Sequence, residues 1–390
     1  MAKIIRKNRI YLPIILFILL SLYGYYDVTT SSQGGIADGD RTVVHIMVPL
    51  LIAIEGIYLL FKRVRNREIT YITTPLYFYG AWLVISSLIN GISLSTIFFY
   101  LLFIIWWILT AKFFSSYTIR NNTHQKLIIR IFVLLFLVWI IFNIKARIQI
   151  NLSNDKYGIT MFIYYVLLLF PFVMLIKNIA LRNILIGIGV VTTIFSLKRG
   201  AIISLPAMLI VFFLIRAKVN GKALGSLGGL ILIFFLIYFL VAYVDQQTEG
   251  LLFSRFDSES LQSGSGRDEL RAAALDNISN RDIIRLIIGL GAGSTVKFLE
   301  TGAHNEWIEA LFSFGIIGIC IYFWMVVGCC RLVINNYKAQ NPVTPYLAMY
   351  VVYLLLSTIF SGFIFMHVAF YFWSGIGVFI GMRDTHCRLL

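Results

Sequence analysis

Residues 302–309 combine a histidine with polar side chains in a pattern that could carry out acid–base chemistry. An imidazole titrates near neutral pH, so His304 could remove the proton from an attacking hydroxyl group. Asn305, Glu306 and Glu309 follow, and the two carboxylates share one face of an expected helix. They could orient the histidine or an acceptor sugar. Alternatively, His304 is a structural hydrogen-bonding residue, and the acids only suit the positive end of a helix dipole.

Two cations, Lys198 and Arg199, interrupt a long apolar stretch and are followed by Gly200 and Ala201. A guanidinium presents a planar fork that matches phosphate oxygens, and the N-terminus of the next helix adds partial positive charge. This pattern indicates an anion site. The same cations could instead be interfacial anchors whose aliphatic stems lie along apolar surface.

A further arginine and a glycine-rich stretch lie in the longest polar segment of the chain. Arg267 follows Ser265 and precedes two acidic residues, which also fits the capped start of a solvated helix. Glycines alternate at positions 289, 291 and 293. Because glycine lets the backbone approach a ligand closely, Gly291 and Gly293 are candidate substrate-binding positions, although no phosphate-binding lysine follows them.

Metal and cofactor sites are not predicted. Glu300, His304 and Glu306 could supply ligands, but no His-rich or Asp-x-Asp spacing supports them, and the four cysteines form no metal or disulfide framework. Glu55 lies inside an apolar run, where a carboxylate is costly enough to suggest function. It could instead be protonated or paired with a neighbouring tyrosine.

The composition indicates that the chain that positions these residues is a membrane protein. Of 390 residues, 59% are hydrophobic and only 13% are charged, and the mean hydropathy is +0.86. Water-soluble domains carry about 25% charged residues, because their surface must be solvated. A secreted disulfide scaffold, a disordered chain and a soluble nucleic-acid binder are therefore excluded.

Apolar runs near the length of a membrane helix, about 20 residues, recur along the chain. They predict an all-α polytopic membrane protein of about 12 transmembrane helices, near residues 10–26, 43–61, 69–89, 92–114, 127–144, 157–176, 184–197, 200–215, 226–244, 306–330, 345–360 and 361–381. The predicted domains are helices 1–9 over residues 1–244, a large external loop over 245–305, and helices 10–12 with a tail over 306–390. Short helices on the membrane surface are expected in the loop.

The distribution of charge indicates the orientation. Most lysines and arginines fall in the segments that share a side with the N-terminus, and the opposite side is nearly neutral. Positive charge marks the cytoplasmic side of a bilayer. Both termini are therefore predicted to be cytoplasmic, and the net charge of +15 is a topology signal and not a sign of nucleic-acid binding.

Taken in order, these features resemble the O-antigen ligase and O-antigen polymerase superfamily of bacterial surface-polysaccharide assembly. The resemblance rests on the 198–201 hinge, Arg267, the glycines of 289–293, and a His304-Asn305 pair opening a helix that ends at residues 315–318. It covers mainly residues 195–320. The family implies a metal-independent glycosyltransferase of GT-C architecture in the bacterial inner membrane, acting at its external face on a glycan linked to undecaprenyl diphosphate.

Carried onto this sequence, the resemblance implies that Arg199 and Arg267 bind the lipid-linked diphosphate. His304 would act as general base or align the acceptor hydroxyl, and a single displacement would invert the anomeric carbon. The remaining substrate-binding positions would be Lys198, Asn305, Glu306, Glu309, Gly291 and Gly293.

Polymerase and ligase share these residues. A polymerase accepts another lipid-linked repeat unit, with a chain-length regulator as an expected partner, whereas a ligase accepts lipid A–core. Lys198 and the Glu306/Glu309 pair favour the polymerase. A secondary transporter is the main alternative outside enzymes, but the repeated halves typical of transporters are not evident in the sequence.

Overall fold

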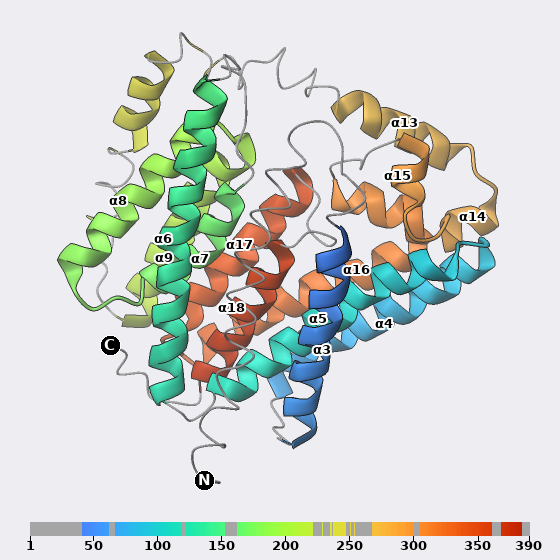
Figure 1. Cartoon of the computed structure of the whole chain (residues 1–390), viewed down its shortest axis with the longest axis horizontal. Coiled ribbons are helices and arrows are strands. Elements are labelled where there is room, and N and C mark those ends of the chain that lie inside the picture. Colours follow the sequence, from blue (N-terminus) through green and yellow to red (C-terminus); the bar gives the residue numbers. More distant parts are fainter. Residues whose placement is uncertain are drawn as a thin grey trace.

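A computed structural model describes residues 41–61, 67–118, 122–152, 162–220, 228, 235, 237–246, 250, 253, 267–299, 305–360 and 368–383. All regular structure in these ranges is helical. The helices are α3 (Arg41–Phe61), α4 (Arg67–Ile89), α5 (Leu94–Thr118), α6 (Asn122–Leu152), α7 (Ile163–Val173), α8 (Ile179–Phe195), α9 (Arg199–Asn220), α13 (Arg267–Ser279), α14 (Ile283–Ile288), α15 (Ser294–Leu299), α16 (Glu306–Lys338), α17 (Thr344–Phe360) and α18 (Val368–Met382) (Figure 1).

Five stretches of the described helices are long and apolar enough to cross a membrane: Glu68–Ile89, Leu94–Thr118, Asn122–Ile148, Arg199–Val219 and Glu306–Lys338. Four shorter apolar helices accompany them, at Ile163–Val173, Ile179–Phe195, Thr344–Ile359 and Ala369–Met382. The chain is therefore a polytopic membrane protein. The predicted run at 10–26 and about half of that at 226–244 lie outside the described residues, so the count of twelve and the GT-C architecture stay predictions.

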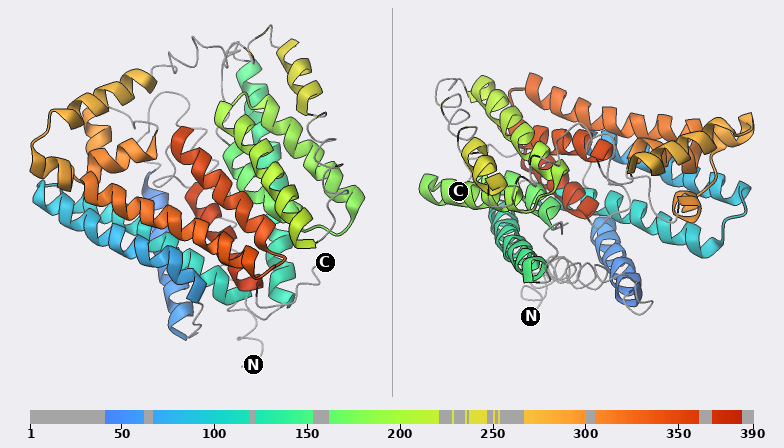
Figure 2. Two further views of the ribbon diagram at one scale, coloured as in Figure 1. Left: turned by 180° about the vertical axis from the view of Figure 1, so that it is seen from behind. Right: turned by 90° about the horizontal axis from the view of Figure 1, so that it is seen from above.

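The helices form two groups joined by a central pair. In Figures 1 and 2, α6, α7, α8 and α9 lie on one side, α3, α4, α5 and α16 on the other, and α17 and α18 between them. α17 packs on α9 and α16, and α18 packs on α5 and α7. The central pair therefore connects the side that carries Lys198 and Arg199 with the side that carries the start of α16.

Small residues let α5 and α18 pack closely. A Cβ added at Gly377 would come within 2.5 Å of the Ala111 carbonyl, and one at Gly381 would collide with Thr118 and Ser115. Helices in a membrane gain little from the hydrophobic effect, so such close van der Waals contact is their main source of association energy. This packing fixes α18, and with it α17, relative to the rest of the molecule.

Two buried carboxylates have partners from neighbouring helices. Glu55 of α3 accepts hydrogen bonds from the Thr110 hydroxyl at 3.1 and 3.3 Å, a partner that sequence reasoning did not identify. Glu68 of α4 pairs with Arg383, which follows α18, and accepts a hydrogen bond from Asn336 of α16 at 3.2 Å. The Glu68 pair joins α4, α16 and the end of α18.

The long segment before α16 contains three short helices, α13, α14 and α15, which lie together at one end of the molecule (Figure 1). Short helices were expected in this loop, and α14 is one of them. Its Ile283 and Ile284 are 72% and 63% exposed, whereas Ala274 of α13 packs into a small cluster with Phe312 of α16. These helices are thus anchored on α16.

Candidate functional site

α16 is a broken helix, and the break determines the geometry of the site. Gly315 has φ 65° and ψ −164°, so it does not continue the helix. In a straight helix, Trp307 and Tyr322 would be separated by about 22 Å along the axis. Their ring centroids are 5.0 Å apart, and Trp307 also lies 6.3 Å from Phe323. The first segment, Glu306–Phe314, therefore folds back along the second, and we call it the half-helix.

Groups from outside the helix satisfy the carbonyls freed by the break. The Leu290 N–H donates to the Phe312 carbonyl at 3.2 Å, and the Gly291 N–H donates to the Ser313 carbonyl at 2.7 Å. The Trp82 indole N–H donates to the Phe314 carbonyl at 2.8 Å. Irregular backbone at membrane depth is tolerated only where protein or trapped water supplies such partners. The glycine-rich stretch and α4 thus stabilise the folded-back conformation.

Glycine is required on both sides of this contact. Gly289 and Gly315 both have positive φ, 82° and 65°. A Cβ on Gly289 would meet the main chain of residues 313–315, and a Cβ on Gly315 would meet the Ile287 carbonyl. Asn90, which follows α4, donates to the Gly289 carbonyl at 2.9 Å. The main chains at Gly289 and Gly315 therefore lie so close together that only a residue without a Cβ fits at either position.

Gly291 and Gly293, the predicted substrate-binding glycines, lie beside this contact. The adjacent Ala292 N–H donates to the Ser87 hydroxyl at 2.9 Å, and a Cβ on Gly291 would come within 2.7 Å of Ile92. A Cβ on Gly293 would lie 3.3 Å from the Tyr100 ring. Their packing against α4 and α5 gives them a structural role, and substrate binding by them stays a prediction.

Arg281, between α13 and α14, holds the loop helices on the break. It donates to the Phe312 carbonyl at 2.9 Å and to Asn277 at 2.7 and 3.1 Å, and it lies 4.1 Å above the Phe312 ring. Burial, and to a lesser extent the neighbouring charge of Arg285, lowers the pKa of Arg281 to about 10. The guanidinium is still charged at neutral pH, so these hydrogen bonds are charge-assisted.

The half-helix begins with the polar residues singled out by the sequence. Asn305 caps it, because its side-chain oxygen accepts from the N–H groups of Trp307 at 3.0 Å and Ile308 at 3.2 Å. Glu306 is only 3% exposed, and Glu309 is half-buried. The positive end of the half-helix therefore carries an Asx cap followed by a buried acid.

The two acids lie near tyrosines of α4, α5 and the second segment of α16. Glu306 and Glu309 lie within electrostatic range of the Tyr79 and Tyr322 phenols, and Glu309 also acts on Tyr100. The Tyr79 and Tyr322 rings are 6.3 Å apart. The two acids thus share one polar environment between α4, α5 and the two segments of α16, as expected from their common helix face.

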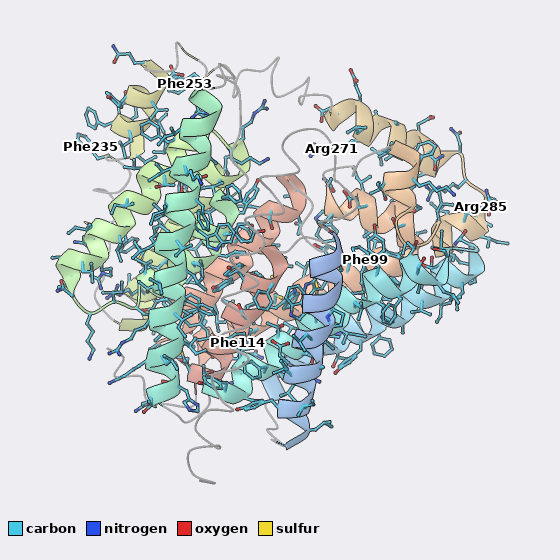
Figure 3. The ribbon with its side chains drawn as sticks, in the orientation of Figure 1. Phe99, Phe114, Phe235, Phe253, Arg271 and Arg285 are labelled. Atoms are coloured by element: carbon cyan, nitrogen blue, oxygen red, sulfur yellow. The ribbon has the colours of Figure 1, made fainter. Side chains whose placement is uncertain are left out.

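A second cation meets the half-helix at the end of α17. Arg271 of α13 donates to the Ile359 carbonyl at 3.1 Å, and the Asn305 amide donates to the same oxygen at 3.5 Å. Arg271 also pairs with Asp268 at 3.4 Å. Figure 3 shows Arg271 on the inner side of the loop helices and Arg285 at their outer edge. Arg271 thus links α13, α17 and the residue that follows His304.

Lys198 and Arg199 lie at the junction of α8 and α9, as the hinge interpretation requires. Leu197 adopts a positive φ of 54°, and the Lys198 carbonyl accepts the first helical hydrogen bonds of α9. Lys198 is 4% exposed, and its ammonium lies 5.8 Å from the centre of the Tyr164 ring. A charge buried this deeply is stabilised by aromatic or anionic groups.

α17 is the element common to both cationic regions. The Tyr164 ring beside Lys198 lies 6.3 Å from that of Tyr353 on α17, and Ile359 at the end of the same helix accepts from Arg271 and Asn305. Arg267 begins α13, but its side chain and His304 lie outside the described residues. The convergence of Arg199, Arg267 and His304 therefore stays a prediction.

Sequence reasoning missed three contributors to the site. Arg271 lies one helical turn after Arg267, so its spacing was a usable signal. Ile359 contributes a main-chain oxygen, which no side-chain pattern can reveal. The fold-back at Gly315 had only the glycine as its signal, and the sequence pattern instead suggested a helix that ends there.

Comparison with known proteins identifies the region that contains these residues. Residues 184–323 match the family model described as O-antigen ligase. The match spans most of α8, all of α9, the loop helices and the break in α16, and it includes each of the predicted site residues. No curated protein matches the chain.

Proposed function

We propose, from the match of residues 184–323 to the O-antigen ligase family model, that this membrane protein polymerises surface-polysaccharide repeat units carried on undecaprenyl diphosphate. The reaction is a metal-independent, inverting glycosyl transfer at the external face of the inner membrane. The fold proposed for it is the GT-C type with about twelve spans, both termini in the cytoplasm, and residues 245–305 outside.

The observation that carries this proposal is the shared acceptor at Ile359. Arg271 and Asn305 converge on one carbonyl, and both come from segments inside the O-antigen ligase match. The helix that carries Arg267 and Arg271 is thereby held against the start of the half-helix, next in sequence to His304. This arrangement suits a donor with a diphosphate leaving group and an acceptor that must lose a proton.

Arg199 and Arg267 would bind the diphosphate. The leaving diphosphate gains negative charge in the transition state, and fixed guanidiniums stabilise that charge more strongly than they stabilise the ground state. Lys198 adds a third cation at the N-terminus of α9, which is itself partially positive.

His304 would accept the proton of the acceptor hydroxyl as the oxygen attacks the anomeric carbon. The bond to the diphosphate oxygen breaks as the new glycosidic bond forms, so the anomeric centre inverts in a single step. A general base must come within about 3 Å of the hydroxyl. Asn305, fixed by its cap and by Ile359, would set the position of the histidine.

Glu306 and Glu309 would bind the acceptor sugar together with the tyrosines beside them. Carboxylates and phenols offer the hydrogen-bonding groups that sugar hydroxyls need. The acceptor proposed here is a second lipid-linked repeat unit, with a chain-length regulator as a partner.

Ligase activity, with lipid A–core as acceptor, is the second candidate, since the matching family model is described as O-antigen ligase. Deleting the gene and separating the surface glycan by gel electrophoresis tests both. Loss of the ladder with a single repeat left on the core supports the polymerase. Loss of all polymer from the core, with lipid-linked polymer accumulating, supports the ligase. An unchanged glycan contradicts both.

A further inference from the structure

A groove lies between α6 and α8, away from the half-helix and the loop helices (Figure 1). Its volume is about 580 Å³, within the range of about 300–1,000 Å³ typical of small-ligand sites. The walls are mostly apolar and include Ile144, Ile148, Ile184, Ile188, Val191 and Phe195. Ile148, Ile184 and Phe195 are 53%, 59% and 38% exposed, so the groove opens to the outside of the helix bundle.

The length of the groove corresponds to one leaflet of a bilayer. It extends from Ile184 to Phe195 along α8, about 16 Å at the helical rise of 1.5 Å per residue. Half of the hydrocarbon thickness is about 15 Å. Gly187 widens the groove one helical turn from its Ile184 end, because a Cβ there would meet nothing within 4 Å.

The polar lining residues gather toward one end. Asn143 donates to the Thr192 carbonyl at 3.3 Å and so joins α6 to α8 at this level. Arg147 lies one helical turn beyond Asn143, toward the end of α8 that leads into Lys198. It is the one charged residue among those that line the groove, and it is partly exposed. The groove therefore has apolar walls along its length and a cation at one end. This arrangement is complementary to an anionic lipid, which has an apolar chain and a negatively charged head group.

We infer that this groove holds one acyl chain of an anionic glycerophospholipid from the surrounding membrane, with the lipid phosphate at Arg147. The inference does not depend on the proposed glycosyl transfer. A single leaflet's depth suits an acyl chain, whereas a polyprenyl chain of eleven isoprene units is several times longer. A lipid held here supports α8 and, through it, the Lys198–Arg199 hinge.

Native mass spectrometry of the purified full chain, titrated with phosphatidylglycerol or phosphatidylcholine in detergent micelles, tests this site. The wild type is expected to retain one phosphatidylglycerol that Gly187→Phe loses, because the ring fills the groove. Gly56→Phe is the matched control, since Gly56 of α3 also faces open space, and it should bind lipid as the wild type does. Arg147→Gln should weaken phosphatidylglycerol binding about fivefold, the effect of one cation at an anionic surface. It should weaken phosphatidylcholine binding less, because the choline cation offsets the charge of the same phosphate.

Three results would overturn the inference. The first is equal lipid retention by Gly187→Phe and the wild type. The second is an Arg147→Gln effect of the same size on both phospholipids. The third is displacement of the bound lipid by undecaprenyl phosphate at concentrations at which added phosphatidylglycerol does not displace it, which would identify a substrate-chain site instead. If Gly187→Phe does not fold, the Arg147→Gln comparison alone decides.

Discussion

Arg271 and Asn305 share one hydrogen-bond acceptor, the main-chain carbonyl of Ile359, although they come from different helices. Asn305 also caps the half-helix, so its side chain connects the start of that helix to the end of α17. Arg271 brings α13 to the same oxygen. Three segments that are distant in sequence are therefore fixed relative to one another at the residue that follows His304.

Arg271→Ala should reduce glycan polymerisation by about tenfold or more, because a hydrogen bond from a charged donor contributes about 1.5–3 kcal/mol. The reduction is expected without loss of protein from the membrane. The measurement is the ladder of surface glycan in a deletion strain that expresses the variant. Arg285→Ala is the matched control, since Arg285 is 64% exposed at the outer edge of the loop helices. Equal ladders from both variants would remove Arg271 from the site.

Gly315→Ala should destabilise the protein by about 2 kcal/mol or more, since alanine is strained at positive φ and its Cβ would meet the Ile287 carbonyl. A lower midpoint of thermal unfolding of the purified protein measures this effect. Gly56→Ala provides the comparison, because a Cβ at Gly56 meets nothing within 4 Å. If the two variants unfold at the same temperature, α16 is not held in its folded-back form.

Arg281→Lys should loosen the loop helices although it keeps the charge. A single ammonium cannot reproduce the fork that reaches both Asn277 and the Phe312 carbonyl. Hydrogen–deuterium exchange of the amides in residues 282–293 is expected to become faster. Arg285→Lys, on an exposed residue nearby, should leave that exchange unchanged. Protection that persists in Arg281→Lys would mean that the contacts of the glycine-rich stretch suffice without Arg281.

Local patterns predicted the helices well. Each apolar run predicted between residues 43 and 215, and each one predicted between residues 306 and 381, overlaps a helix. The hinge at Lys198–Arg199 lies at the junction of α8 and α9. The polar start of α16 was also apparent, because an asparagine before two acids is a strong N-terminal signal. These features depend on neighbours in sequence, and so the sequence alone contains them.

The tertiary arrangement of the site could not be predicted in the same way. Gly315 could end a helix or fold it back, and the outcome depends on Ile287 and Trp82, which come from distant segments. Arg267 and Arg271 both lie on α13, and only the packing of α13 brings Arg271 to Ile359. The glycines at 289–293 suggested a ligand, and no local pattern could reveal that Gly289 and Gly291 also fit against the backbone of α16.

Extension of a synthetic undecaprenyl-diphosphate-linked repeat unit by the purified protein in liposomes tests the central claim most directly. The wild type is expected to form a ladder of products, and Arg199→Ala, Arg267→Ala and His304→Ala are each expected to form none while remaining folded. Ladders of wild-type length from all three variants would contradict the assignment of these residues to the diphosphate and the acceptor hydroxyl.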